Sequence, residues 1–301
     1  MATSGRRAGL PAGQVDAPAC SGMGLVLSSA GAEMNHASSP LISVVTPYRN
    51  SEHFLPHLAA NLQAQSYTHW ECLLVDHAST DQGPALARQI ANADSRFRLL
   101  DIKDPRPFPA LPRNAAVAQA RGELVCFLDV DDLWHPEKLE RQLEFHSNNQ
   151  LELSVTQYGR FHPKEVETAN PGALPKQWRV RRPPTVMNQR KLSFANPIPM
   201  LTVMLNRKLL TLPALEYGPF SLIHHEDYLL WLTLWKHLPN LNYGCLNQTL
   251  AFHRRHSHNL TGNRWRMLSW SYKVYRAHGE QPLAAAVRST RHALLHLFVL
   301  R

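Results

Sequence analysis

The sequence predicts an α/β fold with a mostly parallel, Rossmann-like sheet flanked by helices and a helical C-terminal region. Two observations lead to this prediction. In the first half of the chain, short apolar segments alternate with segments of helical periodicity, the pattern of a parallel sheet covered on both faces. Polar and acidic residues follow several apolar segments, at the strand ends where such sheets bind ligands.

Four short runs rich in β-branched and aromatic residues predict strands. They are LISVVTPY (41–48), the apolar part of WECLLVDHASTD (70–81), FRLLDI (97–102) and ELVCFLDV (123–130). The segments between them predict helices over 51–65, 84–93 and RNAAVAQA (113–120). Since parallel strands end at one edge of a sheet, the polar residues after these strands should lie close together.

The second half of the chain is less regular. Residues 160–199 are rich in proline and basic residues and predict a loop or lid region with short elements. Residues 200–212 predict a strand and a helix, and 224–238 an amphipathic helix with acids at its N-terminus, where the helix dipole favours them. Apolar residues at helical spacing over 264–301 predict helices facing a core or a membrane surface.

Cysteine usage and hydropathy indicate a cytoplasmic protein. The four cysteines have no metal-ligand spacing, and Cys72 and Cys126 lie in apolar runs, as core thiols of a reducing compartment do. No apolar stretch reaches the roughly 18 residues that a membrane span needs. GLVLSSAGA (24–32) is weakly similar to the end of a signal peptide, but its apolar core is too short.

The net charge of +9 is unevenly distributed. Residues 254–301 hold nine Arg or Lys against one acid, and residues 160–191 hold eight against two. Such patches suit phosphates, nucleic acid or anionic membranes, and a solvated basic face is the alternative. As a hypothesis, the basic C-terminal region docks peripherally on the cytoplasmic face of an anionic membrane.

The segment FLDVDDLW (127–134) places Asp129, Asp131 and Asp132 directly after a predicted buried strand. Carboxylates this close repel one another unless a cation neutralises them. Asp131 and Asp132 are oxygen ligands of the kind that Mg²⁺ or Mn²⁺ binds, together with substrate phosphates. An Asp-x-Asp pattern alone is weak, and solvated loop acids are the alternative.

Four motifs in order give a more specific indication. LISVVTPYRN, LLVDHASTD, PRNAAVAQARGELVCFLDVDDLWHPEKL and HEDYLLWL resemble glycosyltransferase family 2, closely over 41–145 and loosely over 194–256. The resemblance implies a GT-A fold. It also implies an inverting, metal-dependent, nonprocessive enzyme that moves one sugar from a nucleotide-sugar, with a UDP-sugar favoured, to a glycan or lipid-linked acceptor in cell-surface polysaccharide synthesis.

The resemblance further implies a division of the chain. A disordered N-terminal extension (1–40) would precede a GT-A domain (41–256), and a basic helical region (257–301) would follow it. Within the domain, 41–145 would form the nucleotide-binding half and 146–256 the acceptor half.

The resemblance also implies roles for individual residues. Those expected around the donor nucleotide are Pro47, Tyr48, Asn50, Asp76, Arg113 and Asn114, with Asp129 toward the ribose. Those expected at the metal and diphosphate are Asp131 and Asp132, with Arg254, Arg255 and His256 closing on the diphosphate. Glu226 and Asp227 would supply the general base, because an attacking sugar hydroxyl must lose its proton.

Some residues depart from the family pattern. The usual Val-Asp-Asp-Gly-Ser has His77 in place of its second Asp and Ala78 in place of its Gly, which leaves recognition of the nucleotide base open. No Gln-x-x-Arg-Trp follows Asp227 and no spans are present, so a processive membrane-embedded synthase is not expected.

Three other classes of protein share single features with this sequence. A catalytically altered nucleotide-sugar-binding or scaffold protein is the main alternative, because of His77 and Ala78. A nucleotidyltransferase should have a Gly-rich loop after its first strand, and TPYRNSEH has none. Only the positive charge suggests a nucleic-acid binder, and no groove-reading motif with interleaved aromatic residues accompanies it. No nucleic-acid partner is therefore expected.

Overall fold

The computed structural model describes residues 39–162, 174–175, 178–215, 218–255 and 264–298, with side chains for all but 264–265 and 295–298. The extension expected over 1–40 lies almost wholly outside these ranges, as does His256. None of the helices in the described ranges combines the length and hydropathy that a membrane span requires.

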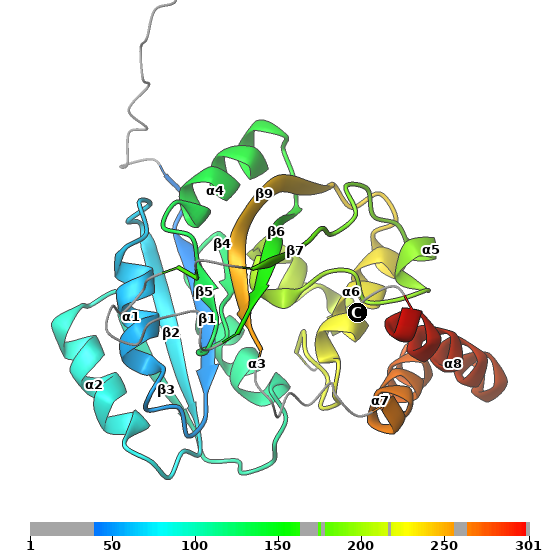
Figure 1. Cartoon of the computed structure of the whole chain (residues 1–301), viewed down its shortest axis with the longest axis horizontal. Helices are drawn as coiled ribbons and strands as arrows, with labels where there is room; N and C mark the ends of the chain where they lie inside the picture. The colour runs from blue at the N-terminus through cyan, green and yellow to red at the C-terminus, as the bar shows by residue number, and fades with distance from the viewer. Residues whose placement is uncertain (1–38, 163–173, 176–177, 216–217, 256–263, 299–301) are drawn as a thin grey trace, which may run out of the picture. The chain divides into compact units, whose positions relative to one another are not determined.

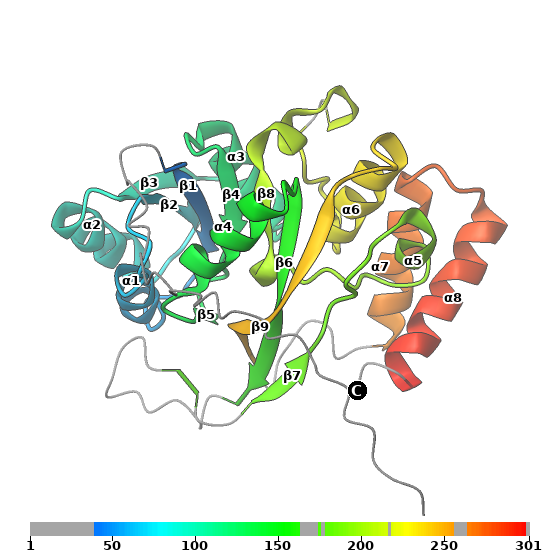
Figure 2. The same ribbon diagram turned by 90° about the horizontal axis from the view of Figure 1, so that it is seen from above.

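A nine-stranded sheet organises residues 39–298, in the order β3-β2-β1-β4-β8-β6-β9-β5 with β7 paired to β6 (Figure 1). The strands are β1 (Ile42–Tyr48), β2 (Trp70–His77), β3 (Phe97–Ile102), β4 (Leu124–Phe127), β5 (Leu133–Trp134), β6 (Leu153–Phe161), β7 (Arg179–Arg181), β8 (Met204–Asn206) and β9 (Tyr243–Arg254). The first four pair in parallel. Antiparallel β8 joins them to β6, which pairs in parallel with β9, and the two run side by side in Figure 2.

Helices cover both faces of this sheet. They are α1 (Leu55–Gln63), α2 (Gly83–Ala93), α3 (Ala110–Gln119), α4 (Lys138–Asn148), α5 (Gln189–Leu192), α6 (Glu226–His237), α7 (Arg264–Ala277) and α8 (Pro282–Phe298). Adjacent residues of β1 face opposite sides: Val44 packs in a core with α1 and α4, and Val45 in a core with α3, α6 and α7. Burial on both faces explains the continuous apolar runs of the parallel strands, and it confirms the predicted α/β class.

Three predicted elements have different bounds in the structure. The first helix begins at Leu55 rather than Ser51, with Pro56 in its first turn, where the missing N–H costs nothing. The fourth strand ends at Phe127, because the backbone turns with Asp132 N–H donating to Asp129 O. The helix expected within 200–212 is replaced by 3₁₀ turns around β8, at Met200–Thr202 and Arg207–Thr211.

Lys138 is a fully buried lysine at the start of α4. Its Nζ lies 2.8 Å from Gln142 Oε1 and 4.0 Å from the ring centroid of Trp134, and burial lowers its pKa from 10.5 to about 8. Between about pH 8 and pH 10.5 the unfolded chain binds more protons than the folded one. The free energy of unfolding should therefore rise with pH in this range.

We therefore expect Lys138→Met to raise the free energy of unfolding at pH 7 by about 1–3 kcal/mol, because methionine fills a similar volume without a buried charge. The advantage over the parent should shrink as the pH approaches 10.5. Chemical denaturation at pH 7, 8.5 and 10 measures this. Lys208→Met, at an exposed lysine, is the control, and a pH-independent difference between Lys138→Met and the parent would contradict the prediction.

Candidate functional site

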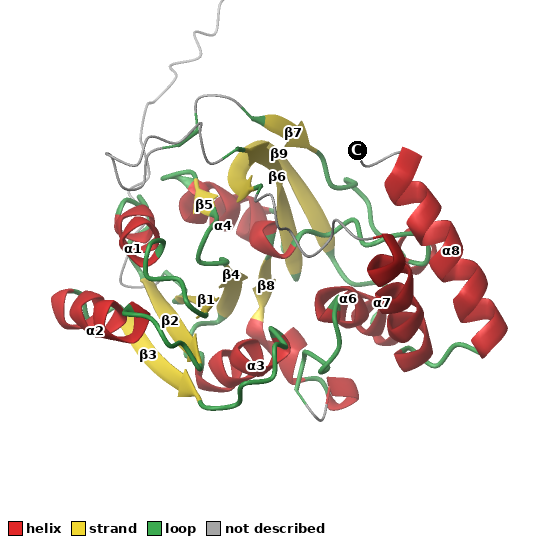
Figure 3. Cartoon of the chain, turned by 60° about the horizontal axis from the view of Figure 1, so that its bottom comes forward, coloured by secondary structure: helices red, strands yellow, loops and turns green. Residues whose placement is uncertain are grey.

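The carboxyl ends of β1, β2 and β4 lie side by side, as the sequence predicts. The strand register pairs Pro47 with Val75 and Tyr48 with Asp76. Beyond β4, Leu128 N–H donates to Val45 O at 3.0 Å, so Asp129 follows directly beside β1. The loops that leave these strands can be followed in Figure 3.

Asn50 ties two of these loops together. Its backbone N–H donates to Ser79 Oγ at 2.9 Å, and its Oδ1 accepts from Thr80 N–H at 2.8 Å. Asn50 and Ala78 both have a left-handed backbone, with φ of 48° and 52°. Glycine adopts this conformation without strain, so alanine at the position of the family's glycine is strained. Strain of this kind gathers at functional sites.

The residues expected beneath the base of the nucleotide are mostly buried. Asp76 Oδ1 accepts from Ser79 N–H at 3.2 Å. Burial, and then the charge of Asp76, raises the pKa of Tyr48, which keeps its phenol neutral. Burial, and then Arg49, lowers the pKa of His77, and its Nε2 is enclosed without a hydrogen-bond partner within the described part of the chain. His77 does not present this nitrogen to solvent.

Arg113 on α3 is the central buried cation of the site. It is 7% exposed, its NH2 donates to Asp129 Oδ1 at 2.8 Å, and its NH1 is bonded to Glu226 Oε1. Burial opposes its charge, but the two carboxylates outweigh burial and raise the pKa of Arg113. Burial raises the pKa of Glu226 to about 7 against the effect of Arg113. Arg113 thus connects the acid motif after β4 to the start of α6.

Asn114 binds the loop before α6, and its place near the nucleotide stays a prediction. Its Nδ2 donates to Phe220 O at 2.7 Å, and its Oδ1 accepts from Phe220 N–H at 2.9 Å. Since both polar ends of the side chain are used, Asn114 fixes the loop before α6.

The three aspartates of FLDVDDLW lie in different surroundings. Asp132 is 2% exposed, and its Oδ1 accepts from Arg254 N–H at 2.9 Å and lies 3.2 Å from His253 Nδ1. Burial raises the pKa of Asp132 despite His253. Asp129 and Asp131 are partly exposed. Asp132 is therefore held against the end of β9, and its role as a metal ligand stays a prediction.

The basic residues at the end of β9 are placed unequally. Arg254 Nε donates to Asp131 O at 2.7 Å, and its guanidinium lies over the rings of Phe54 and Phe161. Arg255 is exposed, and its backbone N–H donates to Phe161 O at 2.9 Å. Arg254 therefore packs against the acid motif, and Arg255 is the more accessible cation.

The acidic pair begins α6 after His225, whose φ is 62°. Glu226 is 5% exposed, whereas Asp227 is partly exposed, with its Oδ2 accepting from Asn196 Nδ2 at 2.9 Å. No sequence pattern points to Asn196, which lies in the irregular segment 160–199. Only Asp227 of the pair can reach a bound molecule directly.

The described residues contain no group of three or more His, Cys, Asp or Glu that could hold a metal by itself. Mg²⁺ and Mn²⁺ in nucleotide sites use one or two carboxylates and complete their shell with substrate phosphates and water. Asp129 and Asp131 fit such a cation by their chemistry and position.

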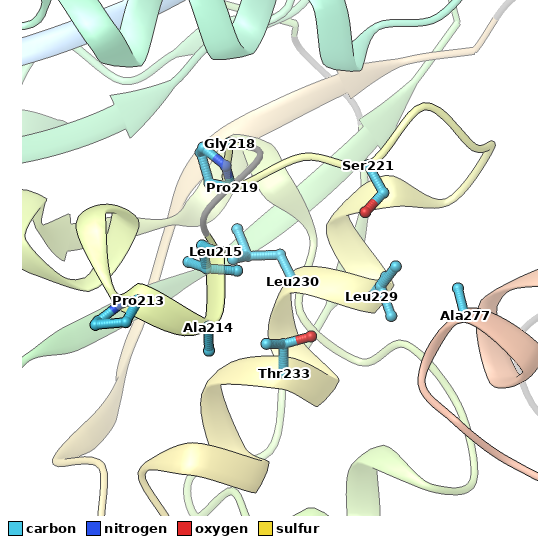
Figure 4. Close-up of a pocket in the computed structure, with 10 residues that line it drawn as sticks. All are labelled: Pro213, Ala214, Leu215, Gly218, Pro219, Ser221, Leu229, Leu230, Thr233 and Ala277. Carbon is cyan, nitrogen blue, oxygen red and sulfur yellow. The ribbon is translucent and has the colours of Figure 1, made fainter.

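A cavity of about 240 Å³ lies under the loop before α6 and is lined by ten residues (Figure 4). Most of its lining residues have apolar side chains, among them Leu229 and Leu230 of α6 and Ala277 of α7, but the surface exposed in the cavity is mostly polar. None of its lining residues is titratable, so this cavity holds none of the predicted catalytic residues.

A comparison with protein families gives a result that agrees with this site. The site places Asp129, Asp131, Arg113 and the acidic pair near the ends of parallel strands. Residues 43–210, more than half of the chain, match glycosyl transferase family 2. The chain belongs to glycosyltransferase family 2. The predictions of the family, of the GT-A fold and of a transferase enzyme are therefore confirmed.

This glycosyltransferase is similar to enzymes of cell-surface polysaccharide synthesis. It is 30% identical over 240 residues to the putative teichuronic acid biosynthesis glycosyltransferase TuaG of Bacillus subtilis (strain 168), covering 79% of this chain and 88% of TuaG. It is 29% identical over 248 residues, 81% of this chain and 88% of the relative, to the UDP-Glc:alpha-D-GlcNAc-diphosphoundecaprenol beta-1,3-glucosyltransferase WfgD of Escherichia coli.

Two solved structures share the fold. S. aureus TarS 1-349 in complex with UDP-GlcNAc superposes with a TM-score of 0.61 at 18% identity, over 85% of this chain and 73% of that one. Glucosyl-3-phosphoglycerate synthase from Mycobacterium tuberculosis, with Mn²⁺, UDP and glucosyl-3-phosphoglycerate, has a TM-score of 0.55 at 17% identity, over 82% of each chain.

Proposed function

We propose that this glycosyltransferase moves one sugar, with inversion, from a nucleotide-sugar to a glycan or lipid-linked acceptor in cell-surface polysaccharide synthesis. A UDP-sugar is the favoured donor. The observation that carries the proposal is the Arg113 bridge, which joins Asp129, on the expected donor side, to Glu226, on the expected acceptor side. The names of WfgD and of the TarS complex support the donor and acceptor classes.

Asp227 is the general base in this proposal. A sugar hydroxyl is a poor nucleophile, so a carboxylate within hydrogen-bond reach must accept its proton during attack. The partly exposed carboxylate of Asp227 is oriented by Asn196, whereas Glu226 is buried against Arg113. Glu226 therefore positions Arg113, and Asp227 touches the acceptor.

A divalent cation, Mg²⁺ or Mn²⁺, belongs to the same proposal. Asp131 and Asp129 would hold it, because carboxylate oxygens are ligands that these hard cations prefer. When bound, the cation would neutralise charge that develops on the leaving diphosphate. Arg255, exposed next to this motif, would add a positive charge from the protein.

Hydrolysis of a panel of nucleotide-sugars, measured with Mn²⁺ and with EDTA, tests this assignment. We expect Asp131→Asn to reduce Mn²⁺-dependent hydrolysis at least about 100-fold, since the variant loses a ligand charge next to the diphosphate. Glu144→Gln, at an exposed carboxylate on α4, should have no effect. Full activity of Asp131→Asn would refute the metal assignment, and absence of donor binding and hydrolysis in the parent would refute the donor class.

We also propose that the enzyme works on the cytoplasmic face of an anionic membrane, which α8 contacts. Leu283, Val287 and Leu294 are 78%, 62% and 48% exposed, and their spacing places them on one face of α8. Helices α7 and α8 hold six Arg or Lys and no acid, and Glu280, in the turn between them, is paired with Arg288. An apolar stripe with surrounding basic charge is typical of helices that lie on anionic membranes.

Flotation with vesicles of phosphatidylglycerol and phosphatidylcholine tests the membrane contact. The parent should float at low salt, and Val287→Glu with Leu294→Glu should stay at the bottom, because the charges face the acyl chains. Ala284→Glu with Ala286→Glu, at two exposed positions beside the stripe on α8, adds the same two negative charges and is the control. Equal flotation of the stripe variant and the parent would contradict the membrane contact.

A further inference from the structure

The segment 193–198 connects the C-terminal helices to the expected general base. Asn196 Nδ2 donates to Asp227 Oδ2 at 2.9 Å, and Asn196 Oδ1 accepts from Ile198 N–H at 3.3 Å. Because Pro197 follows, the backbone of Asn196 is restricted to extended conformations. The direction in which Asn196 presents its amide to Asp227 therefore depends on where the backbone of this segment is held.

Helix α8 holds the first part of this segment. Arg291 NH2 donates to Ser193 O at 2.7 Å, and Arg291 Cζ lies 3.9 Å from the ring centroid of Phe194. A hydrogen bond from a charged donor is stronger than one between neutral groups, and a guanidinium over an aromatic ring adds a cation–π contact. Arg291 thus binds two consecutive residues directly upstream of Asn196.

Helix α7 reaches the same carbonyl. The hydroxyl of Tyr275 donates to Ser193 O at 3.3 Å and lies 2.9 Å from the hydroxyl of Tyr228, which donates to Leu192 O. Both tyrosines are fully buried, so these hydrogen bonds form away from water, where an unsatisfied hydroxyl is costly. Helix α5, which ends at Leu192, lies beside α6, α7 and α8 in Figure 2. The start of the segment is therefore held from both C-terminal helices.

The other end of the segment is held by α6 itself. Trp231 Nε1 donates to Ile198 O at 3.2 Å. Asn196 therefore lies between two anchored points, one on α6 and one on the C-terminal helices. Without the second anchor, the backbone before Asn196 is free to turn, and the amide loses its fixed direction.

We propose that Arg291 is a positioning residue for the reaction. It holds the segment 193–198 so that the amide of Asn196 stays directed at Asp227. The inference rests on the proposed function, in which Asp227 is the general base. A base contributes fully only when its carboxylate is held within hydrogen-bond reach of the attacking group. Helix α8 thereby affects the rate without touching the substrate.

Hydrolysis of the best donor of the nucleotide-sugar panel, with Mn²⁺ and with water as the acceptor, tests this inference on the full chain. Arg291→Met should lower kcat about 5–10-fold, the factor of one hydrogen bond. It should leave KM and the affinity for UDP unchanged, because Arg291 lies outside the residues expected around the donor. Arg291→Lys should be slowed less, since an ammonium group can donate to the same carbonyl. Tyr275→Phe, which keeps a buried ring, should also be slowed less.

A double-mutant cycle separates positioning from a general disturbance of the fold. If Arg291 acts through Asn196, adding Arg291→Met to Asn196→Ala should change kcat by less than about 2-fold, the limit of ordinary additivity. Arg288→Met is the matched control, because it removes the same charge from the same helix while Arg288 pairs with Glu280. Its kcat should stay within about 2-fold of the parent.

Equal kcat in Arg291→Met and the parent would overturn the inference. So would an effect of Arg291→Met that is as large in the Asn196→Ala background as in the parent, because the two residues would then act independently. An equal loss in Arg288→Met, or a parental rate in Asp227→Asn, would overturn it as well. Failure of the proposed function differs from all of these: the parent would bind no UDP and hydrolyse no nucleotide-sugar.

Discussion

Replacing Asp227 with asparagine should reduce sugar transfer by about 10²–10⁴-fold, the usual contribution of a positioned general base. The substitution keeps the shape of the side chain and its contact with Asn196, and it removes the lone pair that accepts the hydroxyl proton. Donor binding should persist, because Asp227 lies at the start of α6, on the side of Arg113 where we expect the acceptor. The loss should therefore appear in kcat, with the affinity for UDP unchanged.

Transfer rates and UDP affinity, measured on the same preparations, decide this prediction. Asn196→Ala is the graded comparison: it leaves the carboxylate in place but removes its orienting donor, so the loss should be smaller than that of Asp227→Asn. Transfer at the parental rate by Asp227→Asn would show that another group accepts the proton.

Replacing Arg113 with methionine should lower the free energy of unfolding by about 3–5 kcal/mol at pH 7.5, the cost of leaving a buried carboxylate without its partner. Glu226 is 5% exposed and loses its only cationic partner among the described residues. The cost should fall at pH 5. The pKa of Glu226 is about 7 with Arg113 present and rises without it, so the folded variant binds a proton there more readily than the unfolded chain.

Chemical denaturation at both pH values measures the effect. Adding Glu226→Gln to Arg113→Met should recover part of the stability at pH 7.5, because no buried charge remains. Arg121→Met, at an exposed arginine, should change the free energy of unfolding by less than about 0.5 kcal/mol. A loss that is independent of pH and of Glu226 would mean that Arg113 stabilises the fold through packing alone.

The parallel half of the fold was predictable because its signal is local. Strands β1, β2 and β4 of the segment 41–127 are short apolar runs buried on both faces, whereas β3, at the edge of the sheet, is buried only at Phe97. The convergence of Tyr48, Asp76 and Asp129 follows from this order alone. The antiparallel half has weaker signals, since β5, β7 and β8 contain only two or three residues each.

The roles of individual polar side chains were less predictable, because their partners are remote in sequence. Asn114 bonds to Phe220 across 106 residues, and Asp132 bonds to Arg254 across 122. Nothing in either local sequence distinguishes a side chain that faces a ligand from one that fixes a loop. Trp270 is another case, since its ring partners His224 and His225 lie more than 40 residues earlier in the chain.

The Arg113 bridge has a consequence for the exchange of segments between relatives. Its three members come from α3, from the turn after β4 and from the start of α6. Recombination between positions 130 and 225 therefore takes Arg113 and Asp129 from one parent and Glu226 from the other. A chimera that receives a neutral residue at position 226 loses the buried ion pair even if every other contact is kept. Among relatives, the charges at these positions should therefore change together. A change of charge at either end of the bridge requires a compensating change in a segment about 100 residues away.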